Sequence, residues 1–210
     1  MKKAIVLLSG GLDSTVTLYY ALSRRNKCYC LIFDYGQKHK KEINYAIKTT
    51  KLTNCEYKVL KFQLPWSNSS LTDKTVKIPV HNKIKTTNIP STYVPARNTI
   101  FLSFALSWAD VIKADNIFIG ANAIDFSGYP DCRPEYFKHI QEIVHSGIKH
   151  GKLKIQVPLL KMSKKEIVRL GYRLEVPFEN TWSCYVGGKH PCNKCDSCKL
   201  RQTGFEQAYE

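Results

Sequence analysis

The stretch that most constrains the fold of this chain runs from Ala4 to Leu18. It opens with a short apolar run, Ala4 to Leu8, which is typical of a strand buried on both faces. The run breaks at Ser9-Gly10-Gly11, and a helical pattern resumes from Asp13. A buried strand that turns through glycines into a helix predicts an α/β domain built on parallel strands.

The turn between this strand and this helix is suited to binding an anion. The first N–H groups of a helix have no partner inside the helix, and the helix dipole places partial positive charge there. Gly10 and Gly11 carry no Cβ atom, so a phosphate can approach the backbone closely. Asp13 can hold Mg²⁺ or cap the helix. Further hydroxyl donors are offered by Ser9, Ser14 and Thr15.

The motif Ser-Gly-Gly-Leu-Asp-Ser resembles the PP-loop of ATP pyrophosphatases, which cleave ATP between the α- and β-phosphates and activate a substrate oxygen as an adenylate. A Walker-type loop is excluded because no lysine stands where that loop needs one. An ordinary glycine turn is the alternative, but here the strand, the helix and the Asp-Ser pair occur together. We therefore predict ATP binding by one continuous segment: Leu8, Ser9, Gly10, Gly11, Leu12, Asp13, Ser14, Thr15, Val16, Thr17 and Leu18.

The length of the chain favours one α/β domain with a small appendage, because 210 residues with a 43% hydrophobic share can bury a sizeable core. No apolar run is long enough to cross a bilayer. The opening Met1-Lys2-Lys3 is followed by only about six apolar residues, too few for a signal-peptide core. We expect a cytoplasmic protein that has no membrane partner.

The formal net charge is +15, from 32 basic and 17 acidic residues. A balance this basic suits anionic ligands such as ATP, pyrophosphate or nucleic acid. The lysines are scattered through every segment rather than gathered in one block, which a lysine-rich proteome would also produce. We therefore expect small anionic ligands and no nucleic-acid partner.

Strands and helices alternate along most of the chain. Further strands are predicted at Cys28–Asp34, Tyr57–Leu64, Asn116–Ala121 and Leu153–Pro158. Helices are predicted at Asp13–Arg25, Lys38–Lys51, Asn98–Ala114 and Pro134–His150, with one more that Ser163 begins through a capping box with Glu166. The short links imply parallel strands and right-handed crossovers, which is a doubly wound, Rossmann-like sheet. Residues 65–96 have no sustained periodicity, and we predict a lid or a dimer-contact loop there, with disorder as the alternative.

Four loops are predicted to form one pocket, because ligands of open α/β sheets bind beyond the carboxyl ends of the strands. The first is the glycine turn. The second, Asp34 to His39, gathers an aromatic ring, an amide and an imidazole. The third contains Arg97, which can clamp a phosphate or a carboxylate. The fourth runs from Gly120 to Pro134. The expected pocket residues of the last three loops are Tyr35, Gln37, His39, Arg97, Asn98, Asn122, Asp125, Tyr129, Asp131 and Arg133.

These pocket residues have plainer alternatives. His39 can be a surface helix residue, and Asn98 can be an ordinary helix N-cap. The fourth loop can be a connector, since Gly, Pro and Asp are common turn residues. Cys132, inside that loop, is expected to be a small packed thiol rather than a nucleophile.

Four of the eight cysteines lie near the end of the chain: Cys184, Cys192, Cys195 and Cys198. The last three are spaced C-x₂-C-x₂-C, and thiolates two residues apart can both reach one tetrahedral ion. A ferredoxin-type run would place its next cysteine where Gln202 stands, so Zn²⁺ is favoured over an iron–sulfur cluster. Four thiolates leave no open position for water, which predicts a structural zinc site; His190 is expected to be a surface residue. We divide the chain into a catalytic domain, residues 1–180, and a four-cysteine tail, residues 181–210.

These motifs, in this order, resemble the 7-cyano-7-deazaguanine synthase family of queuosine biosynthesis. The likeness extends over Leu8–Leu18, Asp34–Glu42, Tyr93–Thr99, Gly120–Phe137 and Trp182–Arg201. The PP-loop is shared by many families, whereas the Gly-Tyr-Pro-Asp-Cys-Arg loop together with the four-cysteine tail is far more specific. Lys38 departs from the family pattern, where arginine is expected. The resemblance implies an adenine nucleotide alpha hydrolase-like sheet and a homodimer.

The resemblance also implies an ATP-dependent C–N ligase. Its reaction converts 7-carboxy-7-deazaguanine, ammonia and ATP to 7-cyano-7-deazaguanine, through adenylation first of the carboxylate and then of the resulting amide. Catalysis would come mostly from positioning and charge stabilisation, with Mg²⁺ on the departing pyrophosphate. The residues expected to carry it are Ser9, Asp13, Ser14 and Arg97.

Two other functions remain open on the sequence. A tRNA-modifying PP-loop ligase or thiolase would suit the basic charge, but a thiolase needs a reactive cysteine pair, and the catalytic half contains no C-x-x-C. Its cysteine candidates are Cys132 with Cys28, Cys30 or Cys55. A non-catalytic zinc module that binds nucleic acid through its tail would leave the PP-loop idle.

Overall fold

The computed structural model describes residues 1–66, 68–80, 89–124, 128–149 and 152–210. Five parallel strands form one sheet in the order β3-β2-β1-β4-β5. The strands are β1 (Lys3–Leu7), β2 (Lys27–Asp34), β3 (Glu56–Lys61), β4 (Asn116–Phe118) and β5 (Lys154–Gln156). The parallel, doubly wound arrangement predicted from the sequence is confirmed.

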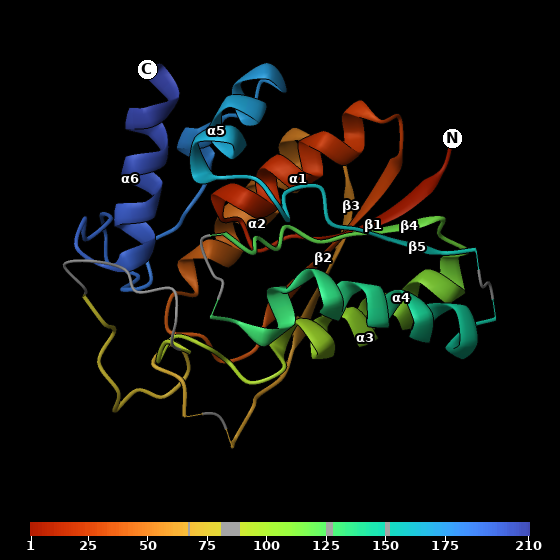
Figure 1. Cartoon of the computed structure of the whole chain (residues 1–210), viewed down its shortest axis with the longest axis horizontal. Helices are drawn as coiled ribbons and strands as arrows, with labels where there is room; N and C mark the ends of the chain where they lie inside the picture. Colours follow the sequence, from red (N-terminus) through yellow and green to blue (C-terminus); the bar gives the residue numbers. More distant parts are fainter. Residues whose placement is uncertain (67, 81–88, 125–127, 150–151) are drawn as a thin grey trace.

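Helices cover both faces of the sheet, as Figure 1 shows, with α1 (Leu12–Ser23) and α2 (Lys41–Leu52) on one side and α3 (Arg97–Ile112) and α4 (Pro134–Gly147) on the other. The alternation of side chains along β1 and β2 divides the core accordingly. Ile5, Leu31 and Phe33 pack with α3 and α4, while Val6, Cys30 and Ile32 pack with α1 and α2. Both faces of these strands are therefore apolar, which explains their nearly unbroken buried runs.

The end of the chain adds two helices that pack side by side, α5 (Lys164–Arg173) and α6 (Asp196–Tyr209) (Figure 1). The predicted capping box at the start of α5 is present, because the Ser163 side chain accepts from the Glu166 N–H and the Glu166 side chain accepts from the Ser163 N–H. Phe178 and Phe205 join the apolar contact between the two helices. Helix α6 was not expected from the sequence, because the cysteine spacing concealed its helical pattern.

The order of the strands places the binding region. The chain runs outward from β1 through β2 to β3 and then returns to β4 on the other side of β1. This reversal makes a crevice between β1 and β4 at their carboxyl ends, the usual ligand position in open α/β sheets. The segment from Leu8 to Ser14 follows β1, and the segment from Ile119 to Asn122 follows β4. No helix among the described ranges is both long and apolar enough to pass through a bilayer.

Candidate active site

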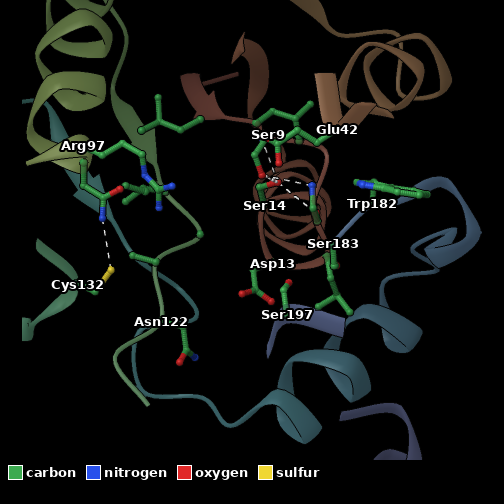
Figure 2. Close-up of a pocket in the computed structure, with 18 of the residues that line it drawn as sticks. Ser9, Asp13, Ser14, Glu42, Arg97, Asn122, Cys132, Trp182, Ser183 and Ser197 are labelled. Atoms are coloured by element: carbon green, nitrogen blue, oxygen red, sulfur yellow. Dashed lines mark hydrogen bonds between the residues drawn. The ribbon is translucent and has the colours of Figure 1, made fainter. Parts of the chain in front are cut away.

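A cavity of about 220 Å³ opens at this crevice. Figure 2 shows Ser9 in the turn before α1 and Asp13 and Ser14 in the first turn of α1, with Arg97 and Asn122 on one side. Trp182, Ser183 and Ser197 come from the tail. All four predicted loops contribute to this one cavity. The residues that line it include Leu8, Ser9, Gly11, Leu12, Asp13, Ser14, Phe33, Tyr35, His39, Glu42, Leu71, Arg97, Asn98, Phe101, Asn122, Tyr129, Cys132, Lys164, Trp182, Ser183, Tyr185, Ser197 and Arg201.

The glycine turn after β1 is held in shape by its own hydroxyl groups. Ser9 Oγ lies 2.9 Å from Ser14 Oγ and accepts from the Gly11 N–H at 3.3 Å. Helix α1 has Gly11 as its N-cap, and no side chain caps it. The first N–H groups of α1 therefore begin at the cavity, where a phosphate can accept from them. Only the first part of the predicted segment lines the cavity, since Thr15, Val16, Thr17 and Leu18 are buried inside the protein.

The glycine turn requires a residue without a Cβ atom at Gly10, and this requirement can be tested. Its φ is +81°, and a Cβ there would lie 2.2 Å from the Glu42 carbonyl oxygen and 2.5 Å from the Ala46 nitrogen, both backbone atoms of α2. We expect Gly10→Ala to lower the free energy of unfolding by about 2–4 kcal/mol and to weaken ATP binding. Thermal unfolding and nucleotide titration check this.

Gly36→Ala is the matched control for Gly10→Ala. Gly36 also has a positive φ, +87°, but a Cβ added there would have no atom of the described residues within 4 Å. Gly36→Ala is therefore expected to lower the free energy of unfolding by the backbone strain alone, about 1–2 kcal/mol. Equal losses in the two variants would contradict a close contact between the turn and α2.

Asp13 forms an ion pair that was not expected from the sequence. Lys164 Nζ, at the first position of α5, lies 2.7 and 2.8 Å from the two Asp13 carboxylate oxygens. The carboxylate does not cap its own helix, so that part of the expectation was wrong. The sequence did contain one indication of Lys164. The capping box at Ser163 predicts a helix start there, so that Lys164 lies in the first helical turn beyond β5.

Arg201 of α6 supplies a second cation to the same end of the cavity. Its guanidinium donates to Thr181 Oγ1 at 2.7 Å, to Ser183 Oγ at 3.3 Å and to the Phe178 carbonyl at 2.9 Å. Burial lowers the pKa of Arg201 from its usual value, although not to a range where it would lose its charge at neutral pH. The PP-loop therefore faces two fixed cations, which suits a polyphosphate.

Arg97 stands at the aromatic end of the cavity. Its Nη1 donates to the Tyr35 hydroxyl at 3.3 Å, and among the described residues no carboxylate lies within ion-pair distance of it. Burial acts against its charge, but Tyr35, Tyr129 and Asp131 hold its pKa above the usual value. A permanent, half-buried cation that no described carboxylate pairs with is suited to an acidic ligand.

The turn that presents Arg97 is strained. Ala96, the N-cap of α3, has a φ of 53°, which lies in the left-handed region. The Ala96 N–H donates to the Tyr93 hydroxyl at 3.0 Å, which helps to hold this conformation. Such strain, about 1–3 kcal/mol, persists mainly where it aims a functional group.

The loop after β2 presents two predicted residues to the cavity and turns another inward. His39 and Tyr35 line the cavity, both almost fully buried. Gln37 does not line it, because its carboxamide accepts from the Tyr35 N–H and donates to the Phe33 carbonyl and to Glu42 Oε1. Gln37 therefore supports the loop from within rather than facing a ligand.

The fourth loop also divides into lining and supporting residues. Asn122 and Tyr129 line the cavity; Asn122 donates to the Leu159 carbonyl at 3.1 Å and Tyr129 pairs with Thr92 at 2.6 Å. Asp131 does not line it, because its Oδ2 accepts from the Asn98 N–H at 2.9 Å and so caps α3. Arg133 is exposed, away from the cavity. Asp125 lies outside the described residues.

Asn98 is not the N-cap of α3, because the helix already begins at Arg97. Its Nδ2 donates to the Asp131 carbonyl at 2.9 Å and reaches Cys132 Sγ at 3.4 Å. Burial, followed by the nearby charge of Asp131, raises the pKa of the Cys132 thiol to about 12. Cys132 is therefore a packed, protonated thiol at neutral pH, as predicted.

The four tail cysteines converge on one point. The sulfur atoms of Cys184, Cys192, Cys195 and Cys198 all lie within 4.8 Å of one another. A tetrahedral ion with Zn–S bonds of about 2.3 Å places its sulfurs about 3.8 Å apart. The Cys195 and Lys194 N–H groups also point at Cys192 Sγ, from 3.3 and 3.5 Å, an arrangement that stabilises a thiolate. The cluster can therefore bind a metal ion.

The cysteine cluster lies against the cavity. Ser183 and Tyr185 flank Cys184, and Ser197 precedes Cys198, and all three line the cavity. The backbone N–H of Trp182 donates to the Gly10 carbonyl at 2.8 Å, and this bond connects the tail to the glycine turn. Folding of the tail therefore completes one wall of the cavity.

Comparison with known proteins identifies the family. A family model described as queuosine biosynthesis protein QueC matches residues 3–209. A 7-cyano-7-deazaguanine synthase of Trichodesmium erythraeum is 48% identical over 98% of this chain and 96% of its own length. The enzyme of that name from Nostoc punctiforme is 46% identical over 98% of this chain and 95% of its own length.

Solved structures show the same fold at lower identity. The U34-tRNA thiolase NcsA of Methanococcus maripaludis has a TM-score of 0.51 and 18% identity, over 99% of this chain and 70% of its own. A 4-thiouridine synthetase in complex with RNA and ATP has a TM-score of 0.56 and 17% identity, over 99% of this chain and 50% of its own. Given the full-length match of the family model and the near-complete coverage of its relatives, this chain belongs to the QueC family of queuosine biosynthesis proteins.

Proposed function

We propose that this protein converts 7-carboxy-7-deazaguanine, ammonia and ATP to 7-cyano-7-deazaguanine, releasing AMP and pyrophosphate at two successive activations. The name shared by its full-length relatives supports this reaction. One observation carries the proposal from the structure: a single cavity holds an anion-binding turn with two cations at one end and an arginine without a carboxylate partner, among the described residues, at the other.

The two ends of the cavity suit the two reactants. ATP phosphates would lie against the α1 N-terminus, with Lys164 and Arg201 stabilising the charge that develops on the departing pyrophosphate. The carboxylate of the deazaguanine would pair with Arg97. Phe101 stacks on Phe33 with ring centroids 3.9 Å apart, and both rings line the cavity beside Arg97, which offers an apolar wall to a flat heterocycle.

The reaction then depends mainly on the alignment of the two reactants. The carboxylate oxygen attacks the α-phosphorus and pyrophosphate leaves, which gives an acyl adenylate. Ammonia displaces AMP and gives the amide. The amide oxygen attacks a second ATP, and loss of AMP from that adduct leaves the nitrile. Holding both reactants in one cavity supplies most of the acceleration.

The proposal includes two metal sites with different roles. Asp13 would bind Mg²⁺ that accompanies ATP, which requires its carboxylate to be shared with Lys164 or released by it. The four-cysteine cluster would hold Zn²⁺, which supplies folding free energy to the tail rather than chemistry. The homodimer and the cytoplasmic location stay predictions that rest on the family resemblance and the sequence.

The tRNA-thiolase alternative has a cysteine requirement that the fold does not favour. Cys28 and Cys30 pack on the α1 and α2 side of the sheet, whereas Cys132 packs on the α3 and α4 side. Cys55, the third candidate partner, also packs on the α1 and α2 side, so the sheet separates Cys132 from all three candidates. A reactive cysteine pair at the cavity would need a rearrangement of the core.

Replacement of Cys132 tests this alternative. We expect Cys132→Ala to retain nitrile synthesis to within about 3-fold and to lower stability by about 1–2 kcal/mol, because the thiol is only packed. Steady-state product formation and thermal unfolding measure the two effects. Loss of all activity in a folded Cys132→Ala variant, together with tight, salt-sensitive tRNA binding, would instead favour the thiolase.

Analysis of the products tests the proposal itself. The protein is mixed with ATP, Mg²⁺, ammonium and 7-carboxy-7-deazaguanine, and the products are separated and weighed by mass spectrometry. We expect the nitrile together with AMP. Release of ADP in place of AMP would overturn the proposed cleavage between the α- and β-phosphates.

A further inference from the structure

His39, which lines the cavity, carries a buried nitrogen that no described residue satisfies. Its side chain is 4% exposed, and its Nε2 lies 3.2 Å from Glu42 Oε2. Its Nδ1 is also buried, and no hydrogen-bond partner for it exists among the described residues. Buried polar atoms are nearly always satisfied, so this nitrogen, which belongs to a residue that lines the cavity and has no partner in the described part of the chain, calls for one.

Glu42 is held in the position of an orienting carboxylate. Its Oε1 accepts from Gln37 Nε2 at 3.1 Å, while Gln37 is fixed by the Tyr35 N–H and the Phe33 carbonyl. Glu42 lies in the first turn of α2. An ionised carboxylate at Nε2 assigns the proton to that nitrogen and leaves the lone pair on Nδ1.

The pair lies where the two halves of the cavity meet. The backbone of Glu42 packs against Gly10 of the glycine turn, and both Glu42 and Ser9 line the cavity (Figure 2). The tail covers His39 from the other side, with the Tyr185 ring centroid 5.4 Å from the His39 ring centroid. His39 therefore sits between the proposed phosphate site and the aromatic end, shielded from bulk water.

We propose that His39 Nδ1 is the base that removes the last proton from the substrate nitrogen in the nitrile-forming step, with Glu42 as its positioning residue. The inference rests on the proposed function. In that step the adenylated amide has the form of an imidate, R–C(=NH)–O–AMP. The N–H bond breaks and its proton passes to Nδ1, the N–H electrons form the third C–N bond, and the C–O electrons leave with AMP. The imidazolium then releases the proton when AMP and nitrile depart.

The other acidic and basic groups at the cavity are less suited to accept this proton. Asp13 is ion-paired with Lys164 through both oxygens, and both Glu42 oxygens accept hydrogen bonds. Burial raises the pKa of both Tyr35 and Cys132, so these two groups hold their protons at neutral pH. Amide formation makes a weaker demand, because the nitrogen that attacks the acyl adenylate becomes positively charged and loses its proton readily. The demand for a base is therefore greatest at the second activation.

The test separates the two activations in the full-length protein. His39→Ala and His39→Gln are given ATP and Mg²⁺ with either the acid and ammonium or the 7-carboxamide, and products are followed by mass spectrometry. We expect the acid to be converted to amide at a rate within about 3-fold of the original, the amide to accumulate, and its conversion to nitrile to fall about 100-fold or more in kcat. Added imidazole should restore part of the second step in His39→Ala.

His139→Ala is the matched control for His39→Ala. His139 makes the same i,i+3 contact, Nδ1 to Glu142 Oε2 at 3.2 Å, but its side chain is 70% exposed. We expect no change in either step. Glu42→Gln should slow nitrile formation about 10-fold with little change in KM for the amide, because the imidazole keeps its place but loses its anionic partner.

Three outcomes would overturn this role for His39. The first is an equal loss in both steps; the second is a rise in KM for the amide with unchanged kcat, which would indicate substrate binding. The third is the absence of imidazole rescue in a folded His39→Ala variant. Failure of the proposed function is distinguishable, since the unmodified protein would then form neither amide nor nitrile.

Discussion

Replacing Arg97 with methionine is expected to lower kcat/KM for the acid substrate about 1,000-fold, because an acidic group would enter the cavity without its partner. Arg97→Lys keeps the charge but loses the planar fork, so an intermediate loss of about 10- to 100-fold is expected. Steady-state kinetics with 7-carboxy-7-deazaguanine measure both variants. The guanidinium has no carboxylate partner among the described residues, so its removal leaves no buried acid behind within that part of the protein.

The 7-carboxamide provides the control for Arg97. This substrate is uncharged, so Arg97→Met should impair its conversion to nitrile far less than it impairs use of the acid. Equal losses with the acid and the amide would mean that Arg97 does not recognise the carboxylate. That result would favour a charge-independent role in its place, such as packing of the guanidinium over the Tyr35 ring.

Replacing Cys195 with serine is expected to have the other large effect. Cys195 is fully buried within the four-sulfur cluster, and structural zinc contributes about 10–16 kcal/mol to the folding of small zinc modules. We expect the zinc content to fall from about one ion per chain to near zero, with a large fall in Tm and a loss of nitrile synthesis. Activity should be lost as well because the tail carries Ser183, Tyr185 and Arg201 into the cavity.

Cys55→Ser is the matched control for Cys195→Ser. Cys55 is a half-buried thiol that is not part of the cluster. Its replacement should leave both metal content and activity unchanged. Two results would contradict the proposed ligand set and its role: full zinc content in Cys195→Ser, or a metal-free variant that keeps full activity.

The features that could be predicted from the sequence depend on local pattern. The strand, glycines and helix of Ala4–Leu18 occur within one short segment, and the structure places them as a turn at a cavity. The capping box of Ser163 and Glu166 is likewise a local signal, and it was correct. The cysteine spacing predicted a common point for the four sulfur atoms, which the fold provides.

The features that could not be predicted depend on contacts between distant segments. Nothing near Asp13 in the sequence indicates that Lys164 will reach it, because α5 and α1 meet only after the sheet has formed. Gln37 and Asp131 have the same residue types as ligand-binding groups, yet one supports a loop and the other caps α3. Polar residues in a loop predict a polar site, but only the fold decides which of them face the cavity and which support it.

The fate of the substrate oxygens tests the central claim most directly. The acid is prepared with ¹⁸O in its carboxylate and incubated with the protein, ATP, Mg²⁺ and ammonium, and the AMP is analysed by mass spectrometry. We predict that the AMP carries ¹⁸O in its phosphate and the pyrophosphate carries none, because each carboxylate oxygen leaves bound to the α-phosphorus. Unlabelled AMP alongside the nitrile would contradict activation of the substrate oxygen as an adenylate.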